Sequence, residues 1–209
     1  MCDESRDTKA AIMPGKDDGV DEMDLWWSAR EEAMQGVLGD ADDIVGHATI
    51  PFDMGADIGG AADIIYFHKH LAGSVVATSE LIGRDDQVAN QLGNYELMIC
   101  HRSDDEDSKE WGADIICRLA YYTCDAELNP GETMDIRQSA PEGSTITALL
   151  FFDYAKFKVR DRDCGLLLCM GITDLELKAC REGNRNSVEK ALKAGGVYPF
   201  TDLFRKSVV

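Results

Sequence analysis

Two long apolar runs constrain the fold of this chain more than any other feature. TITALLFFD covers residues 145–153, and CGLLLCMGIT covers residues 164–173. Successive side chains of a strand point to opposite faces of the sheet. A strand that is apolar at nearly every position is therefore covered on both faces, as in the middle of a sheet. The two runs therefore predict central strands with helices packed on both faces. Between them, KFKV (156–159) is expected as a further short strand.

Other segments supply the rest of a sheet. AADIIYFH (61–68) and SVVATSEL (74–81) are rich in β-branched and aromatic residues, which favours strands, and HKHLAG joins them. NYELMICH (94–101) alternates its larger side chains and predicts a third strand. Asn129-Pro130-Gly131-Glu132 has the pattern of a type II turn, because proline presets the second position and glycine accepts positive φ at the third.

Helices are indicated by apolar spacing and by capping residues. Apolar residues at helical spacing predict helices over 24–38 and 103–123. Thr173 with Glu176 matches a capping box, so a short helix should run to about Arg181. Asn186 with Glu189 repeats the pattern and predicts a last helix that ends at Gly195-Gly196. The expected class is α+β, a mixed β-sheet flanked by helices.

The chain length fits one domain. Its 209 residues lie within the range of a single hydrophobic core. The first 22 residues carry many charged residues and few apolar ones, so we expect 1–22 to be a flexible acidic leader. Residues 23–209 are expected to form the single α+β domain.

The charge balance restricts the possible partners. With 39 acidic and 21 basic residues the formal net charge is −18. Nucleic acids and anionic membranes need a basic surface, so both are excluded as expected partners. A basic protein would be attracted. The alternative is that the acidity serves solubility alone.

Cysteine usage indicates the compartment. The chain has seven cysteines and no CxxC pair, and most lie in apolar runs such as LLLCM. Buried free thiols are typical of a reducing environment. The sequence contains no signal-peptide pattern and no apolar run of membrane-spanning length. We therefore expect a cytoplasmic protein.

No catalytic, cofactor or metal site is predicted. His68 and His70 lie two residues apart on an expected strand, but a zinc site needs more ligands, and His47 and His101 would have to be brought to them by the fold. GxSxG, P-loop and GxGxxG motifs are absent from the sequence. An enzyme that uses His68, His70 or Glu80 remains an alternative.

Surface recognition is the remaining class of function. The acidic run between the third strand and the second long helix could contact a basic protein through its carboxylates, which are Asp104, Asp105, Glu106 and Asp107. The competing interpretation is a solvated helix start, where acids favour the helix dipole. Strand addition at an open sheet edge is a second recognition mode, although the sequence does not identify the free edge.

The order of motifs resembles a known family. GGAADIIYF, VVATSELI, NYELMI, the tryptophan helix, LNPGETMDI, ITALLFF and LLLCMGITDLEL follow one another as they do in the suppressor-of-fused domain. The resemblance runs from about Trp26 to Val208. It implies an α+β domain with a mixed sheet and a role without catalysis.

The resemblance also implies a kind of partner. Animal proteins of this type bind a zinc-finger transcription factor and hold a short peptide as an added strand between two lobes, and this chain is too short for both lobes. Single-domain bacterial relatives are regarded as immunity proteins that neutralise polymorphic toxins. The hypothesis from sequence is therefore a protein-binding domain that occludes a protein partner, a basic toxin. A self-associating scaffold that uses an open sheet edge is the other alternative.

Overall fold

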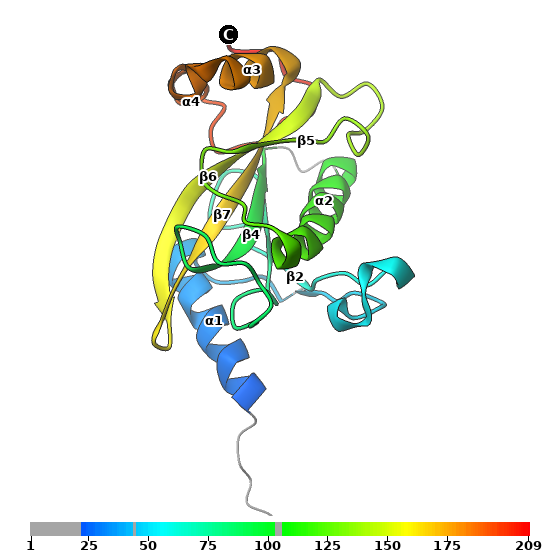
Figure 1. Cartoon of the computed structure of the whole chain (residues 1–209), viewed down its shortest axis with the longest axis vertical. Coiled ribbons are helices and arrows are strands. Elements are labelled where there is room, and N and C mark those ends of the chain that lie inside the picture. The colour runs from blue at the N-terminus through cyan, green and yellow to red at the C-terminus, as the bar shows by residue number, and fades with distance from the viewer. Residues whose placement is uncertain (1–21, 44, 103–105) are drawn as a thin grey trace, which may run out of the picture.

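The computed structural model describes residues 22–43, 45–102 and 106–209, and its centre is a seven-stranded mixed sheet. The strand order is β1-β2-β3-β4-β7-β6-β5; β4 and β7 run parallel, and the other neighbouring pairs run antiparallel. Figure 1 shows the elements, which are α1 (Glu22–Leu38), β1 (Val45–Gly46), η1 (Phe52–Met54), η2 (Ala56–Ile58), β2 (Ile64–Tyr66), β3 (Ser74–Thr78), β4 (Asn94–His101), α2 (Glu106–Asp125), β5 (Thr133–Asp135), β6 (Ile146–Val159), β7 (Arg162–Thr173), α3 (Asp174–Ala179), η3 (Cys180–Asn184) and α4 (Arg185–Ala194).

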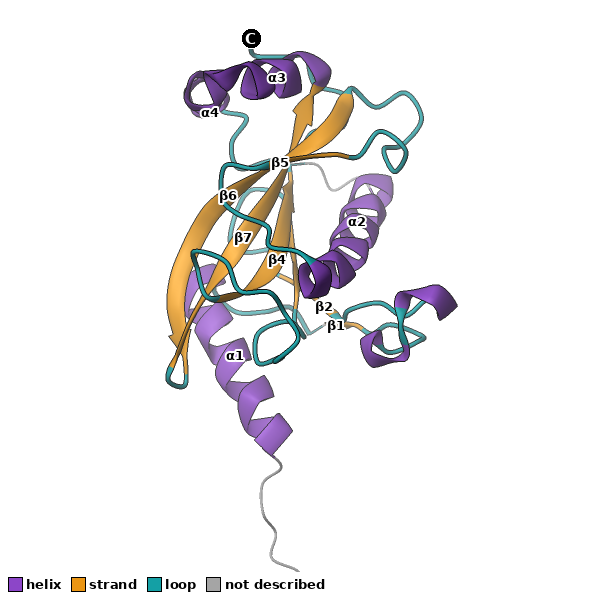
Figure 2. Ribbon diagram, viewed as in Figure 1, coloured by secondary structure: helices purple, strands orange, loops and turns teal. Residues whose placement is uncertain are grey.

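Each face of the sheet is covered by helices. The face toward α2 buries one apolar cluster, which includes Leu97, Leu149 and Ile116. The opposite face packs against α1 and against the α3–α4 pair and includes Met34 and Leu192. Cys164 and Cys169 lie in different clusters, as their odd spacing along one strand requires. The two-sided burial predicted from the apolar runs is confirmed, and the fold is a mixed sheet with flanking helices (Figure 2).

The structure corrects three of the expected elements. TITALLFFD and KFKV form one strand, β6, because the irregularity between Asp153 and Ala155 bends the ladder without ending it. The run 61–68 is a strand only over β2, so His68 and His70 lie in the turn that follows and not on a strand. The helix boundary expected at Asn186 is also wrong: α4 begins at Arg185, and no side chain caps it.

A left-handed glycine explains the misplaced cap. Gly183 has φ +89°, a conformation outside the helical region, so the chain kinks within η3 and α4 starts two residues later, at Arg185. Asn186 is therefore inside a helix, and Glu189 pairs with Arg185 at 3.2 Å instead of closing a capping box. The expected leader, residues 1–22, lies outside the described residues except for Glu22.

A buried carboxylate ties α1 to the sheet. Glu96 of β4 accepts the amides of Leu81 and Ile82 at 2.9 and 2.8 Å and the hydroxyl of Thr78 at 2.6 Å. Arg30 of α1 lies 3.8 Å from the same carboxylate and donates to the carbonyl of Ile82. The loop after β3 is thus held by a buried carboxyl group with hydrogen bonds on both oxygens, the arrangement that a buried polar group requires.

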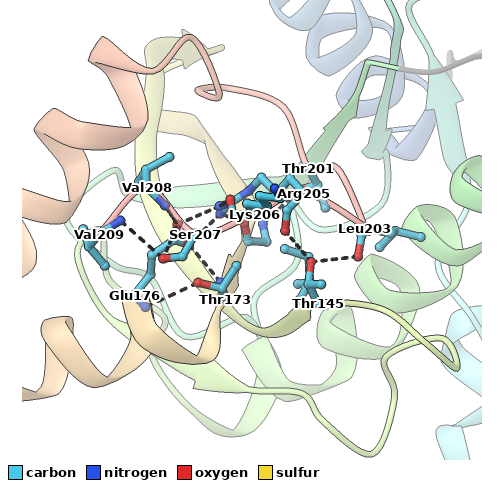
Figure 3. Close-up of polar contacts among 12 residues, drawn as sticks. Thr145, Thr173, Glu176, Thr201, Leu203, Arg205, Lys206, Ser207, Val208 and Val209 are labelled. Carbon is cyan, nitrogen blue, oxygen red and sulfur yellow. Dashed lines mark hydrogen bonds and ion pairs between the residues drawn. The ribbon is translucent and has the colours of Figure 1, made fainter.

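A second buried carboxylate holds the C-terminal segment (Figure 3). Glu176 completes the predicted capping box with Thr173, accepting its amide at 2.8 Å. Its two oxygens also accept hydrogen bonds from both terminal nitrogens of Arg205, each at 2.6 Å, and from the amide of Val208 at 2.9 Å. Burial raises the pKa of Glu176, but these donors outweigh that effect and hold the pKa below its ordinary value. One carboxylate therefore fixes both the start of α3 and the path of the tail.

We expect Arg205→Met to lower the free energy of unfolding by about 3–5 kcal/mol, because the variant leaves Glu176 buried without its counter-charge. Urea unfolding of the folded domain measures the change. Arg118→Met is the matched control, since Arg118 pairs with Asp114 at the surface and its loss should cost at most about 0.5 kcal/mol. Equal effects of the two variants would contradict the importance of the buried pair.

His101 gives a second prediction. Its ring is 1% exposed, stands edge-on to Trp111, and has no hydrogen-bond partner on either nitrogen among the described residues. A Cβ at Gly112 would lie 2.0 Å from its Nε2, so α2 can approach this closely only at glycine. Burial lowers the pKa of His101 from 6.5 to about 4.

Because the unfolded chain binds this proton more readily, the contribution of His101 is fully present above pH 6.5 and is lost as the pH falls toward 4. The loss should amount to about 3 kcal/mol over that window. Chemical unfolding of the wild type and of His101→Leu across the window measures it, since the other titrations cancel in the difference. Parallel pH curves for the two proteins would show that His101 does not carry the effect.

Candidate functional site

The predicted acidic contact surface falls at the edge of what the structure describes. Asp104 and Asp105 lie outside the described residues. Glu106 and Asp107 begin α2, but their side chains are outside the description. Their role in binding stays a prediction.

The histidines of the enzyme alternative point to separate partners. Nδ1 of His68 donates to the carboxylate of Asp42, whereas Nε2 of His70 lies 2.6 Å from the hydroxyl of Tyr154. Burial lowers the pKa of His70. Among residues 22–43, 45–102 and 106–209, no group of three or more His, Cys, Asp or Glu is placed to hold a metal ion.

Glu80 lies in a different part of the fold. Its carboxylate accepts the amide of Asp63 at 2.8 Å, and Asp63 in turn contacts His47 at 2.7 Å. Burial raises the pKa of Glu80, and the charge of Asp63 adds to the effect. The three residues named for a possible enzyme are therefore not brought together.

One arrangement has the order of a hydrolytic triad. Asp42 contacts Nδ1 of His68, and Nε2 of His68 lies 3.4 Å from the hydroxyl of Ser74. A nucleophilic serine must reach a substrate, and Ser74 is 0% exposed at the start of the central strand β3. The contact is best explained as the hydrogen bond that a buried hydroxyl needs.

A groove follows the outer edge of the sheet instead. β5 is the last strand on one side, pairing with β6 only, and no further strand of the described chain lies beyond it. Two pockets of about 760 and 520 Å³ lie along it and share Tyr122, Met134 and Asp135. α2 borders the groove on one side, through residues such as Leu119, and η3 with the start of α4 borders it on the other.

The free edge of β5 offers backbone groups to this groove. The amide of Ile136 donates to the carbonyl of Thr147 on β6 at 2.9 Å. Residues of an antiparallel strand alternate between facing the partner strand and facing away. The amides and carbonyls of Thr133 and Asp135 therefore point outward, away from β6. Met134 packs toward the α2 face of the sheet, which directs the neighbouring side chains to the α3 face.

The turn before β5 shapes one end of the groove. Gly131 has φ +88°, and the amide of Glu132 donates to the carbonyl of Asn129 at 3.1 Å, which confirms the predicted turn. A Cβ at Gly131 would lie 2.1 Å from a terminal nitrogen of Arg185. Glycine is thus needed twice, for the left-handed backbone and for the approach of the Arg185 guanidinium.

The groove is close to neutral, in contrast to the chain as a whole. Four arginines line it, Arg118, Arg137, Arg181 and Arg185, together with three acidic residues, Glu127, Glu132 and Asp135. Asp135 pairs with Arg137 at 2.8 Å and lies 3.8 Å from Arg181, and Arg137 also contacts Asp174 at the start of α3. These pairs connect β5 and the residues after it to α3 and η3.

The sequence indicated strand addition at an open sheet edge but did not identify β5 as that edge. The turn at 129–132 and the alternation of TMDI after it were the available signal for a short edge strand. Tyr122, Arg181 and Arg185 carry no motif, and they come together only because η3 turns back toward β5.

We expect Ser74 to be unreactive toward a fluorophosphonate, because its hydroxyl is fully buried. Intact-mass measurement after incubation of the native protein should show no adduct. An adduct that disappears in Ser74→Ala would overturn this prediction and restore the enzyme alternative with His68 as the base.

No helix in the described part of the chain is long and apolar enough to cross a membrane.

A comparison with curated proteins finds no match. Among solved structures, a suppressor of fused homologue from Neisseria gonorrhoeae superposes with a TM-score of 0.60 and 16% identity, covering 90% of this chain and 98% of that one. A chain of the Sufu-Fu complex superposes with a TM-score of 0.62 and 14% identity, covering 89% and 90%. The family model described as Suppressor of fused protein (SUFU) matches residues 69–206, and the chain therefore belongs to that family.

Proposed function

We propose that this chain is a non-enzymatic protein-binding domain that pairs an extended segment of its partner with the outer edge of β5. The observation that carries the proposal is the unpaired edge of Thr133–Asp135 running through a groove between α2 and η3. Strand addition supplies main-chain hydrogen bonds for affinity and side-chain pockets for specificity. The existence of a Sufu-Fu complex supports protein binding as the general activity of such domains.

The geometry of the groove suits an extended segment. A strand added to β5 would direct alternate side chains to opposite faces of the sheet. One set would meet the wall formed by Leu119, Tyr122 and Met134, and the other would meet Arg181 and Arg185. The side chains on the two faces of the bound segment would thus contact surfaces of different chemistry, one apolar and one basic.

We further infer that the partner is a basic protein, a toxin that this chain neutralises by occlusion. The support is the net charge of −18, which would speed association with a basic partner. The near-neutral groove would then contribute the contact that persists at high salt. The proposal treats residues 23–209 as one acting domain. It places that domain in the cytoplasm, supported by six free cysteines among the described residues.

We expect Thr133→Pro to weaken partner binding at least roughly tenfold. Proline removes the outward amide and projects its ring into the path of an added strand, while the ladder to β6 keeps its bonds. Affinity capture from the native cells at low and high salt identifies the partner, and titration of the purified partner measures the change.

Thr133→Ala is the matched control, since it shortens the same side chain and keeps the amide. Its binding should match that of the wild type, and both variants should unfold at similar urea concentrations. Equal binding by the proline variant and the alanine variant would refute docking at β5. A mass that rises with concentration and falls in Thr133→Pro would instead indicate that the edge pairs with a second copy.

A further inference from the structure

A loop that projects from the sheet beside α2 presents apolar side chains to solvent. η1 and η2 lie in residues 51–60 and stand away from the sheet (cyan in Figure 1). Met54 is 62% exposed and Ile58 is 54% exposed. Scattered exposed apolar residues are common on protein surfaces, so their exposure alone carries no conclusion.

The loop is held rigidly by the rest of the fold. Pro51 bridges Ala61, which closes the loop at its base. The ring of Phe52 stacks on Tyr121 of α2 with centroids 4.1 Å apart, and the Tyr121 hydroxyl donates to the Phe52 carbonyl at 2.6 Å. The guanidinium of Arg84 lies 4.6 Å from the Phe52 ring centroid on another side. Phe52 is therefore anchored from α2 and from the loop after β3.

Close backbone contacts complete the loop. The amide of Gly60 donates to the carbonyl of Gly55 at 3.0 Å. A Cβ at Gly60 would lie 2.3 Å from the Tyr121 hydroxyl and 2.8 Å from the Pro51 carbonyl, so glycine alone fits here. A surface that is already ordered loses little conformational entropy when it binds, and Met54 and Ile58 are carried by such a surface.

Charge distinguishes this loop from the β5 groove. Asp53 and Asp57 directly precede Met54 and Ile58 in the chain, and Arg84 pairs with Asp53 at 2.6 Å and with Asp86 at 2.8 Å, so these four charged groups sum to a net negative charge. The groove, by contrast, has four arginines against three acids. A basic partner would thus meet a net negative field at the loop and no such field at the groove.

We propose that residues 51–60 form a second docking surface, which places Met54 and Ile58 in an apolar pocket of a basic protein. The inference rests on the proposed function for the kind of partner and adds the surface that meets it. A few anchor residues that enter desolvated pockets of the partner carry most of the binding energy at protein interfaces, and charge complementarity around them speeds association. A second copy of this chain is a poor occupant, because it would bring the same carboxylates against one another.

The test titrates the purified partner from the capture experiment against four proteins. These are the wild type, the double variant Met54→Ser/Ile58→Ser, the double variant Leu175→Ser/Phe204→Ser, and the single variant Thr133→Pro. Leu175 and Phe204 are 58% and 61% exposed, so their double variant removes equally exposed apolar residues elsewhere. We expect the Met54 and Ile58 double variant to bind about 100-fold more weakly, the effect of losing two anchors, with its urea midpoint unchanged. The Leu175 and Phe204 variant should bind like the wild type.

Asp57→Lys adds a kinetic readout, because Asp57 carries charge beside the anchors. We expect slower association and a weaker salt dependence, with dissociation nearly unchanged. Equal weakening by both serine double variants would overturn the proposal, since it would report general loss of apolar surface. If Thr133→Pro alone weakens binding, this proposal fails and the proposed function stands. If no protein is retained at high salt by the wild type, both fail.

Discussion

The carboxylate of Glu176 is the interaction on which the arrangement around the groove depends. It lies fully buried between the start of α3 and the C-terminal segment, and its two oxygens are shared among Arg205, Thr173 and Val208. A buried charge with this many donors fixes the geometry of the groups around it. Because α3 leads through η3 into α4, the position of Glu176 also sets where Arg181 and Arg185 meet β5.

The fold presents two surfaces of different character. The β5 edge offers directional backbone bonds in a nearly neutral groove, whereas the 51–60 loop offers apolar side chains within a negative field. Long-range attraction governs the rate of encounter, and desolvated short-range contacts govern how long a complex lasts. In the proposed binding, the acidity of the chain and the arginines of the groove are therefore compatible, since they would act at different stages and at different places.

Periodicity predicted the parts of the fold that local physics determines. The apolar runs fixed β7 and most of β6 as central strands, and the spacing of Trp111, Ile115 and Leu119 predicted α2. The capping box predicted at Thr173 was also correct, because its two hydrogen bonds, between Thr173 and Glu176, are made within four residues. The capping box expected at Asn186 was wrong, since the left-handed kink at Gly183 lets α4 begin at Arg185, one residue before the expected cap. Family resemblance identified the fold class on the order of segments.

The candidate site was less predictable because its parts are distant in sequence. β5 has three residues and no strong strand pattern, and Arg185 reaches it across 54 residues to contact the Gly131 carbonyl. The buried partner of Glu176 lies 29 residues away, in a tail that shows no helical or strand periodicity. Such contacts are set by the packed fold, and composition alone does not reveal them.

Exposure, and not the order of residue types, separates a catalytic group from a structural one in this fold. Asp42, His68 and Ser74 stand in the order that hydrolases use, yet Ser74 lies beneath the surface at the edge of a core strand. A hydroxyl there must be hydrogen-bonded to remain buried, and the imidazole supplies that partner while its other nitrogen binds the carboxylate. Thr133 and Asp135 show the reverse: their side chains carry no motif, but their outward backbone groups are accessible in the groove. Accessibility therefore favours recognition through the sheet edge over chemistry at the histidine.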